Sequence, residues 1–402
     1  MRVSVVIPTY NRADYLKEAL CSVKAQTHSP FEIIVVDDGS TDQTETVVNN
    51  FDHEIRYLRR NHEGVAAARS AGVTAAQGDI LAWLDADDLW EPTFLKTVIQ
   101  RFVANPEIDG VYTGLNRIDG TGHLLPQSST RVVPPDDLYH NLIEGCLIQT
   151  STFAVRKACF DEVGLFDRRF DICEDYDMFL RLAAKFSLVG IPKALVKYRV
   201  HAHNTVKNTD VFCRDRLALS EKHFGSFEGD PRTWHKKKRR AHAFAWRAVG
   251  LRYLEIRQYD QGWHYLHAAC QAWPNILDRL DTFYELVCYD QPAGHRGHTA
   301  GLDIKGNGET MLQGLNRIFA DATSELASMR DPAYGNAYLT LALLSDQAGA
   351  WVESRRYLLQ AIRCNPRLLR LPLVMRKGLK LWLKPSLTRI GDALHVGTGD
   401  CL

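Results

Sequence analysis

Residues 1–40 read MRVSVVIPTYNRADYLKEALCSVKAQTHSPFEIIVVDDGS and hold two strand patterns with a helix pattern between them. Residues 3–7 and 33–36 are apolar runs rich in β-branched residues, and Pro8 ends the first run. The apolar positions of the helix pattern are Leu16, Ala19, Leu20 and Val23. Strands that are apolar throughout are typical of a parallel sheet that helices cover on both faces.

The same alternation continues to about residue 115. Strand patterns occupy residues 55–58 and 80–84, residues 64–77 form an Ala-rich helix pattern, and Pro92 suits the first turn of another helix. We therefore predict an α/β fold with a Rossmann-like, mainly parallel sheet. Ligands of such sheets bind at the carboxyl ends of the strands. Residues 116–170, rich in Gly, Pro and Asp, predict mostly loops.

Helical patterns replace the strand patterns after about residue 240, close to the charged run 236–240. We predict the α/β domain over residues 1–228 and an all-α helical domain over residues 229–402.

The second half contains a weak internal repeat. Five residues recur 92 positions later, namely Tyr265, Leu266, Ala269, Pro274 and Leu277 as Tyr357, Leu358, Ala361, Pro366 and Leu369. The spacing resembles a tetratricopeptide helix pair, in which small residues such as Gly262 and Ser354 let two helices approach closely. Two ordinary helical hairpins are the alternative.

The composition is that of an ordinary globular protein. Of 402 residues, 45% are hydrophobic and 24% are charged, and the net charge of +1 gives no reason to expect a nucleic-acid partner. The nine cysteines are scattered without a CxxC pair, which favours reduced thiols over a disulfide framework or a zinc site. The N-terminus reads as a strand rather than a signal peptide, so we expect a cytoplasmic protein.

Residues 367–384 alternate Arg and Lys with Leu and Trp. A basic, apolar helix of this kind can lie on an anionic membrane, which would place the protein at the inner membrane face. A helix that caps the repeat core is the alternative, and Pro372 interrupts either one.

Asp37 and Asp38 follow the second strand pattern. A carboxylate there can accept a hydrogen bond from a nucleobase or a ribose hydroxyl. An Asx turn that leads into a helix capped by Ser40 and Gln43 would use the same residue types.

Residues 83–90, WLDADDLW, carry three carboxylates directly after an apolar strand. Close like charges repel by about a kcal/mol per pair, and a divalent cation removes that conflict. Because Mg²⁺ and Mn²⁺ prefer oxygen ligands and bridge to phosphates, Asp85, Asp87 and Asp88 predict a metal or nucleotide site. A solvated acidic turn is the alternative.

Two later segments also carry candidate catalytic or ligand-binding side chains. Residues 173–177, CEDYD, place three acids in the first turn of a helix, where the helix dipole alone would favour them. Residues 198–204 end a strand with Arg199, His201 and His203, which suit phosphate or metal contacts or an exposed loop.

Taken in order, the segments VSVVIPTYNR, IIVVDDGSTD, EGVAAARSAG, LAWLDADDLW and CEDYDMFLRLA resemble the inverting family 2 glycosyltransferases, which have the GT-A fold. The resemblance covers roughly residues 1–220. It implies a nucleotide-sugar site on Pro8, Thr9, Tyr10, Arg12, Asp38, Arg69 and Asp85. It also implies a divalent metal, Mn²⁺ or Mg²⁺, on Asp87 and His201, with His203 as a chemically equal choice, and Asp175 as the general base, with Asp177 less important.

The implied reaction moves a hexose or N-acetylhexosamine from a nucleoside-diphosphate donor, UDP by family habit, to a hydroxyl of a glycan, lipid-linked or protein acceptor. The anomeric configuration inverts, the metal neutralises the leaving group, and Asp175 takes the acceptor proton. A dinucleotide-dependent oxidoreductase would need a Gly-rich turn after the first strand, which residues 8–12 lack. A non-catalytic interaction protein with a degenerate transferase domain is the other alternative.

Overall fold

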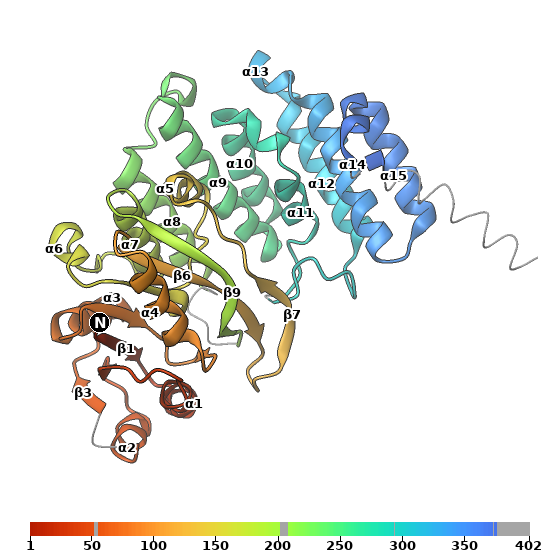
Figure 1. Ribbon diagram of the computed structural model, residues 1–402. Coiled ribbons are helices and arrows are strands. Elements are labelled where there is room, and N and C mark those ends of the chain that lie inside the picture. Colours follow the sequence, from red (N-terminus) through yellow and green to blue (C-terminus); the bar gives the residue numbers. More distant parts are fainter. Residues whose placement is uncertain (52–54, 202–207, 293, 373, 376–402) are drawn as a thin grey trace, which may run out of the picture. The chain divides into compact units, whose positions relative to one another are not determined.

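The computed structural model describes residues 1–51, 55–201, 208–292, 294–372 and 374–375 (Figure 1). The chain divides into two compact units. Unit 1 comprises residues 1–228, 235–245 and 292–295, and unit 2 comprises the rest. The predicted domain boundary after residue 228 stays a prediction, because pieces of the segment 229–295 belong to each unit.

Unit 1 is built on a nine-stranded sheet. Its strands are β1 (Val3–Thr9), β2 (Glu32–Asp37), β3 (Ile55–Arg59), β4 (Ile80–Trp83), β5 (Leu89–Trp90), β6 (Gly110–Ile118), β7 (Leu124–Ser129), β8 (Phe153–Arg156) and β9 (Leu188–Arg199). Its helices are α1 (Ala13–Lys24), α2 (Thr44–Asn49), α3 (Val65–Ala75), α4 (Phe94–Ala104), α5 (Pro135–Glu144), α6 (Cys159–Val163), α7 (Glu174–Ala183) and α8 (Thr209–Phe224), with a 3₁₀ turn η1 (Thr150–Thr152) before β8.

The strand order is β3-β2-β1-β4-β8-β6-β9-β5, and β7 pairs with β6. Strands β3, β2, β1 and β4 are parallel, as the sequence predicts. The rest of the sheet is mixed, because β8 runs antiparallel to β4 and β6 while β9 runs parallel to β6. The α/β fold class is confirmed, and the segment expected to be mostly loop in fact holds β7, α5 and β8.

The apolar runs form central strands because they fill two cores at once. Along β1, Val5 and Ile7 pack into one core and Val6 into the other, as the alternation of side chains along a strand requires. All three are fully buried, and each such side chain contributes about 1.5–3 kcal/mol relative to an exposed one. Gly72 lets α3 lie against β1, since a Cβ at this position would clash with Val6.

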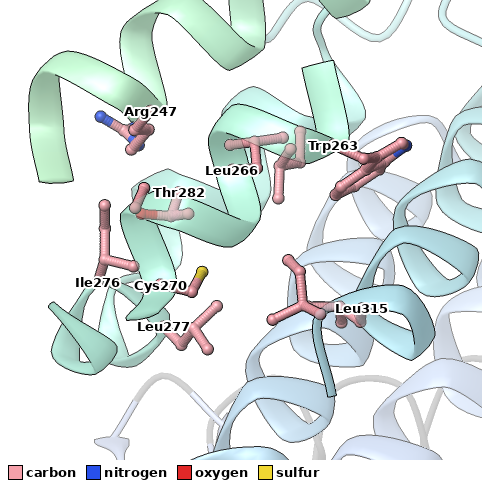
Figure 2. A pocket seen from close by; sticks show the side chains of 11 residues that line it. Arg247, Trp263, Leu266, Cys270, Ile276, Leu277, Thr282 and Leu315 are labelled. Atoms are coloured by element: carbon pink, nitrogen blue, oxygen red, sulfur yellow. The ribbon is translucent and has the colours of Figure 1, made fainter. Parts of the chain in front are cut away.

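Unit 2 is helical. Its elements, with α9 beginning in unit 1, are α9 (Lys236–Glu255), α10 (Tyr259–Ala272), η4 (Pro274–Asp278), α11 (Leu280–Val287), α12 (Ile304–Ala320), α13 (Ser324–Ala327), α14 (Arg330–Gln347), α15 (Trp351–Cys364) and η5 (Pro366–Arg370), after the turn η3 (Pro231–Thr233). A cavity of about 10 Å³, room for a single water, is lined by residues of α9, α10, η4, α11 and α12. Figure 2 shows the side chains that line it.

The repeat positions do bring helices together. A Cβ on Gly250 would lie 2.9 Å from the carbonyl oxygen of Gly262, and 92 residues later the Ser354 hydroxyl donates to the Ala342 carbonyl at 2.7 Å. The assignment to tetratricopeptide repeats stays a prediction. The basic segment 367–384 lies mostly outside the described residues, which end at Met375. Among the described helices, none combines the length and the apolar character of a membrane span.

Candidate active site

The carboxyl ends of β1, β2 and β4 meet at one edge of the sheet. The Asp38 amide donates to the Thr9 carbonyl at 2.9 Å, and the Leu84 amide donates to the Val6 carbonyl at 3.1 Å. The motifs that follow β2 and β4 therefore lie on either side of the end of β1. This is the arrangement that the strand pattern predicts.

Asp38 holds the loop before α3. Its carboxylate is almost fully buried and accepts the amides of Glu63 and Gly64, each at 2.9 Å. It also contacts His62 Nδ1 at 2.7 Å, and the His62 ring stacks on Tyr10 with the ring centroids 4.0 Å apart. Tyr10 is 41% exposed, so His62 contacts both an exposed aromatic ring and a buried carboxylate.

The other residues assigned to the nucleotide pocket lie near the end of β1. Pro8 and Thr9 are buried in the strand, and the Thr9 hydroxyl has no hydrogen-bond partner within the described part of the chain. Arg12 precedes α1 and donates to the Asn11 carbonyl at 3.2 Å. The predicted capping box is wrong. The Ser40 hydroxyl instead accepts the Asn11 amide at 2.9 Å, the N-cap residue Gln43 makes no side-chain cap bond, and Asp42 accepts the first amide of α2, that of Thr44, at 3.0 Å.

The acidic turn after β4 divides into three environments. Asp85 accepts Arg69 Nη2 at 2.7 Å, and Asp87 Oδ2 lies 2.9 Å from His201 Nε2. Asp88 is buried and accepts the Ser151 hydroxyl at 2.6 Å and the Arg199 amide at 2.9 Å. The two residues assigned to the metal are thus in contact, while His203 lies outside the described residues.

Arg69 joins this turn to α7. Its guanidinium donates to both Asp85 and Glu174, and both Arg69 and Glu174 are buried. Burial lowers the pKa of Arg69, but the charges of Asp85, Glu174 and Asp175 outweigh that effect and raise it. Arg69 therefore stays charged and holds the two acidic motifs together, and a contact between Arg69 and a nucleotide stays a prediction.

Asp175 lies next to this ion pair at the start of α7. It accepts the Thr150 hydroxyl at 3.0 Å and the Tyr176 amide at 2.6 Å. Burial raises its pKa, Arg69 and the Thr150 hydrogen bond oppose that rise, and the net result is a pKa above the ordinary value. A raised pKa makes Asp175 a stronger carboxylate base.

The side chain of Arg199 holds the acidic turn after β4, residues 85–88, in place. It is 1% exposed, and its guanidinium donates to the Asp87 carbonyl at 2.8 Å and to Glu18 at 2.7 Å. Its Cζ also lies 4.6 Å from the Tyr15 ring centroid. The side chain thereby fixes the backbone of Asp87 against α1.

A family model described as glycosyl transferase family 2 matches residues 4–164. Residues 4–164 are thus similar to glycosyltransferase family 2 over most of unit 1. Similar proteins include an uncharacterized glycosyltransferase of Rickettsia prowazekii, 33% identical over 218 residues that span 50% of this chain and 65% of that protein. Another, from Nostoc sp., is 33% identical over 51% of this chain and 66% of its own length. The chain thus spans somewhat less than two thirds of these relatives.

Solved structures support the same fold. The structure of S. aureus TarS 1–349 in complex with UDP-GlcNAc has a TM-score of 0.52 at 18% identity, covering 78% of this chain and 92% of that one. The complex of the same protein with UDP has a TM-score of 0.51 at 21% identity over the same shares. These likenesses confirm the GT-A fold of the family 2 domain.

Three polar residues of the candidate site carry no sequence motif: His62, Thr150 and Ser151. Thr150 and Ser151 lie in η1, which the antiparallel pairing of β8 with β4 places beside the end of β4. Ser151 accepts the Asp85 amide at 3.0 Å as well as donating to Asp88. No periodicity or spacing in residues 116–170 reveals these contacts.

We expect Asp88 to stabilise the fold through its hydrogen bonds and not to bind the ligand. In Asp88→Asn the amide oxygen can accept the Arg199 amide and the amide nitrogen can donate to Ser151, so both hydrogen bonds survive. In Asp88→Ala the buried Arg199 amide loses its partner, which costs about 1–3 kcal/mol. Urea unfolding should show a loss of about 2 kcal/mol for the Ala variant and less than half of that for the Asn variant. Equal losses would contradict this assignment.

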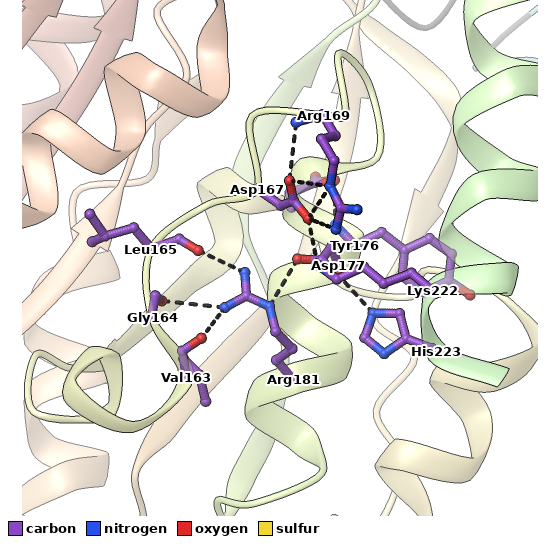
Figure 3. A network of polar contacts seen from close by, with 11 residues as sticks. Val163, Gly164, Leu165, Asp167, Arg169, Tyr176, Asp177, Arg181, Lys222 and His223 are labelled. Atoms are coloured by element: carbon purple, nitrogen blue, oxygen red, sulfur yellow. Dashed lines mark hydrogen bonds and ion pairs between the residues drawn. The ribbon is translucent and has the colours of Figure 1, made fainter. Parts of the chain in front are cut away.

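Asp177 anchors α7 from its buried face, as Figure 3 shows. It is fully buried and contacts Arg181 at 2.9 Å, Lys222 at 2.5 Å and His223 at 2.8 Å. Burial raises its pKa, but the hydrogen bond from His223 and the charges of Arg181 and Lys222 bring it below the ordinary value. This network gives Asp177 more structural importance than its sequence context indicates.

The anchor predicts a pH-dependent stability. Because its pKa is depressed in the folded protein, the ionised Asp177 stabilises the fold above the unfolded pKa of ~3.9, and that contribution is lost as the pH falls through the folded pKa. Asp177→Asn should therefore lower the free energy of unfolding by about 3 kcal/mol at pH 7, and the difference from wild type should shrink below about pH 4. Urea unfolding at both pH values measures it, and a constant difference would refute the role.

Proposed function

We propose that the chain transfers a hexose or N-acetylhexosamine from a UDP-linked donor to an acceptor hydroxyl with inversion at the anomeric carbon. The observation that carries the proposal is the Arg69 bridge, which connects Asp85 of the donor motif to Glu174, the neighbour of the proposed base Asp175. A donor held at Asp85 and an acceptor held at Asp175 would then lie on either side of one buried guanidinium. The names of the relatives, and TarS in complex with UDP and UDP-GlcNAc, support the same reaction class.

The side chains present suit a divalent cation whose remaining ligands come from the phosphates of the donor. The described residues contain no group of three or more His, Cys, Asp or Glu side chains that could hold a metal alone. Asp87 and His201 offer one carboxylate and one imidazole in direct contact. Mg²⁺ in nucleotide sites is typically held by one or two carboxylates together with substrate phosphates. When bound there, the cation would offset the charge that develops on the leaving diphosphate.

The chain's own groups would perform the remaining tasks. Asp38 would accept a base N–H, and the Tyr10 ring offers a stacking surface. Asp175 would accept the acceptor hydroxyl proton as that oxygen attacks the anomeric carbon, and its raised pKa improves the match to that proton. The acceptor, whether glycan, lipid-linked or protein, would approach from the side of Asp175. Cytoplasmic location and contact with a membrane through residues 367–384 remain predictions.

A panel of nucleotide sugars tests the function. Each is added with Mn²⁺ in a thermal-unfolding assay, followed by measurement of UDP release with and without acceptor sugars. A donor at about 100 times its Kd should add about 2.7 kcal/mol of stability. If no nucleotide sugar stabilises the protein and none is hydrolysed or transferred, a non-catalytic interaction protein becomes the better interpretation.

A further inference from the structure

We propose that His62 competes with the donor nucleobase for Tyr10 and Asp38, and so weakens donor binding. This inference rests on the proposed function, because it assumes that the base binds at these two residues. The imidazole makes the two contacts that a nucleobase would need there. It stacks on Tyr10 at a centroid distance of 4.0 Å with 15° between the ring planes, and its Nδ1 lies 2.7 Å from Asp38 Oδ2.

The backbone fixes His62 in this place. Gly39 has a φ of +83°, and a Cβ there would lie 2.9 Å from the His62 amide nitrogen. A glycine therefore lets the segment before α3 pass directly against the end of β2. The amides of Glu63 and Gly64 then donate to the Asp38 carboxylate, which holds the next two residues of the segment as well.

The hydrogen-bonding capacity of Asp38 makes the competition specific. A carboxylate has about four acceptor positions. One on each oxygen is taken by a backbone amide, and the ring of His62 lies against Oδ2, with Nδ1 at 2.7 Å from Oδ2 and 3.1 Å from the Asp38 carbonyl oxygen. The Asp38 side chain is 5% exposed, so a base N–H that reaches Oδ2 would meet the imidazole first. Stacking on the face of Tyr10 that His62 covers would meet the same obstacle.

Displacement of His62 would disturb little else. Its side chain is 56% exposed, whereas the Asp38 side chain and the backbone around it are held from several sides. The neighbouring residues Arg59, Arg60, Asn61 and Glu63 line an open surface hollow of about 460 Å³. The side chain can therefore move while Asp38 and the helix start stay in place.

Titration calorimetry with UDP and with uridine in the presence of Mg²⁺ tests this proposal on the full chain. His62→Ala should bind both ligands more tightly than wild type, on the order of tenfold, since the ligand no longer displaces the imidazole. Uridine isolates the contribution of the base from that of the phosphates. His28→Ala, at an exposed position in the segment after α1, is the matched control and should leave both affinities unchanged.

The double variant Tyr10→Ala/His62→Ala checks the mechanism. If the ring and the base compete for Tyr10, the gain from His62→Ala should be several times smaller in the Tyr10→Ala background, and the two effects should not be additive. Equal or weaker binding by His62→Ala, with wild type binding UDP, would overturn the competition and make His62 a contributor to the base site. If neither wild type nor any variant binds UDP or uridine, the proposed function fails and this inference fails with it.

Discussion

Asp175→Asn is expected to lower kcat by about 10²-fold or more, the usual scale for loss of a general base. The substitution keeps the size of the side chain and leaves its oxygen free to accept either the Thr150 hydroxyl or the Tyr176 amide, the two groups that hold the carboxylate. It removes the basicity that the raised pKa of Asp175 strengthens. Donor affinity should change little, because the donor contacts are assigned to Asp38, Asp85 and Asp87.

The measurement is steady-state turnover at saturating acceptor, together with the Kd of the donor by calorimetry. Asp161→Asn, an exposed acid on α6, is the control for the loss of one negative charge. Turnover of Asp175→Asn near the wild-type rate would place the base elsewhere. Glu174 would then be the first candidate. Arg69 contacts its Oε1, its Oε2 has no hydrogen-bond partner among the described residues, and burial raises its pKa to about 8.

Asp87→Ala is expected to abolish most activity while the protein still folds. The reason is that Asp87 and His201 form the proposed metal-binding pair, while the fold of the loop depends on the carbonyl of Asp87, to which Arg199 donates. Wild type in excess EDTA should show the same loss, and Mn²⁺ or Mg²⁺ should restore wild type but not the variant. We expect a fall of at least about 10²-fold, the scale of one lost electrostatic contact to a developing charge.

Asp14→Ala, an exposed acid in the first turn of α1, provides the control for this variant. A thermal melt distinguishes lost folding from lost metal. Full wild-type turnover in excess EDTA would rule out the metal site, and it would leave the bond between His201 and Asp87 as a structural contact.

The parts of the structure that follow from local pattern were predictable. The apolar runs of β1, β2 and β4 predict that these segments are buried strands. The acids that follow them predict the edge of the sheet at which a site forms. Asp38 and Asp85 could be placed at that edge without a structure.

The rest depends on contacts between distant parts of the chain. Ser151 reaches Asp85 because β8 pairs with β4, and residues 116–170 contain no periodicity that announces this pairing. In the sequence Ser40 resembles a helix cap. In the structure its hydroxyl accepts the amide of Asn11, which lies 29 positions earlier and has a φ of +50°. In both cases a tertiary partner decides which hydrogen bond a local pattern makes.

The mixed sheet has a consequence for synthesis of the chain on the ribosome. One edge of β4 pairs with β1, which is made earlier, but the other pairs with β8, whose first residue, Phe153, comes 70 positions after Trp83, the last residue of β4. At about 5–20 residues per second the new chain would carry an unpaired apolar strand edge for several seconds. During that interval β4 is open to pairing with another nascent chain, so its aggregation should depend on translation speed between residues 84 and 156.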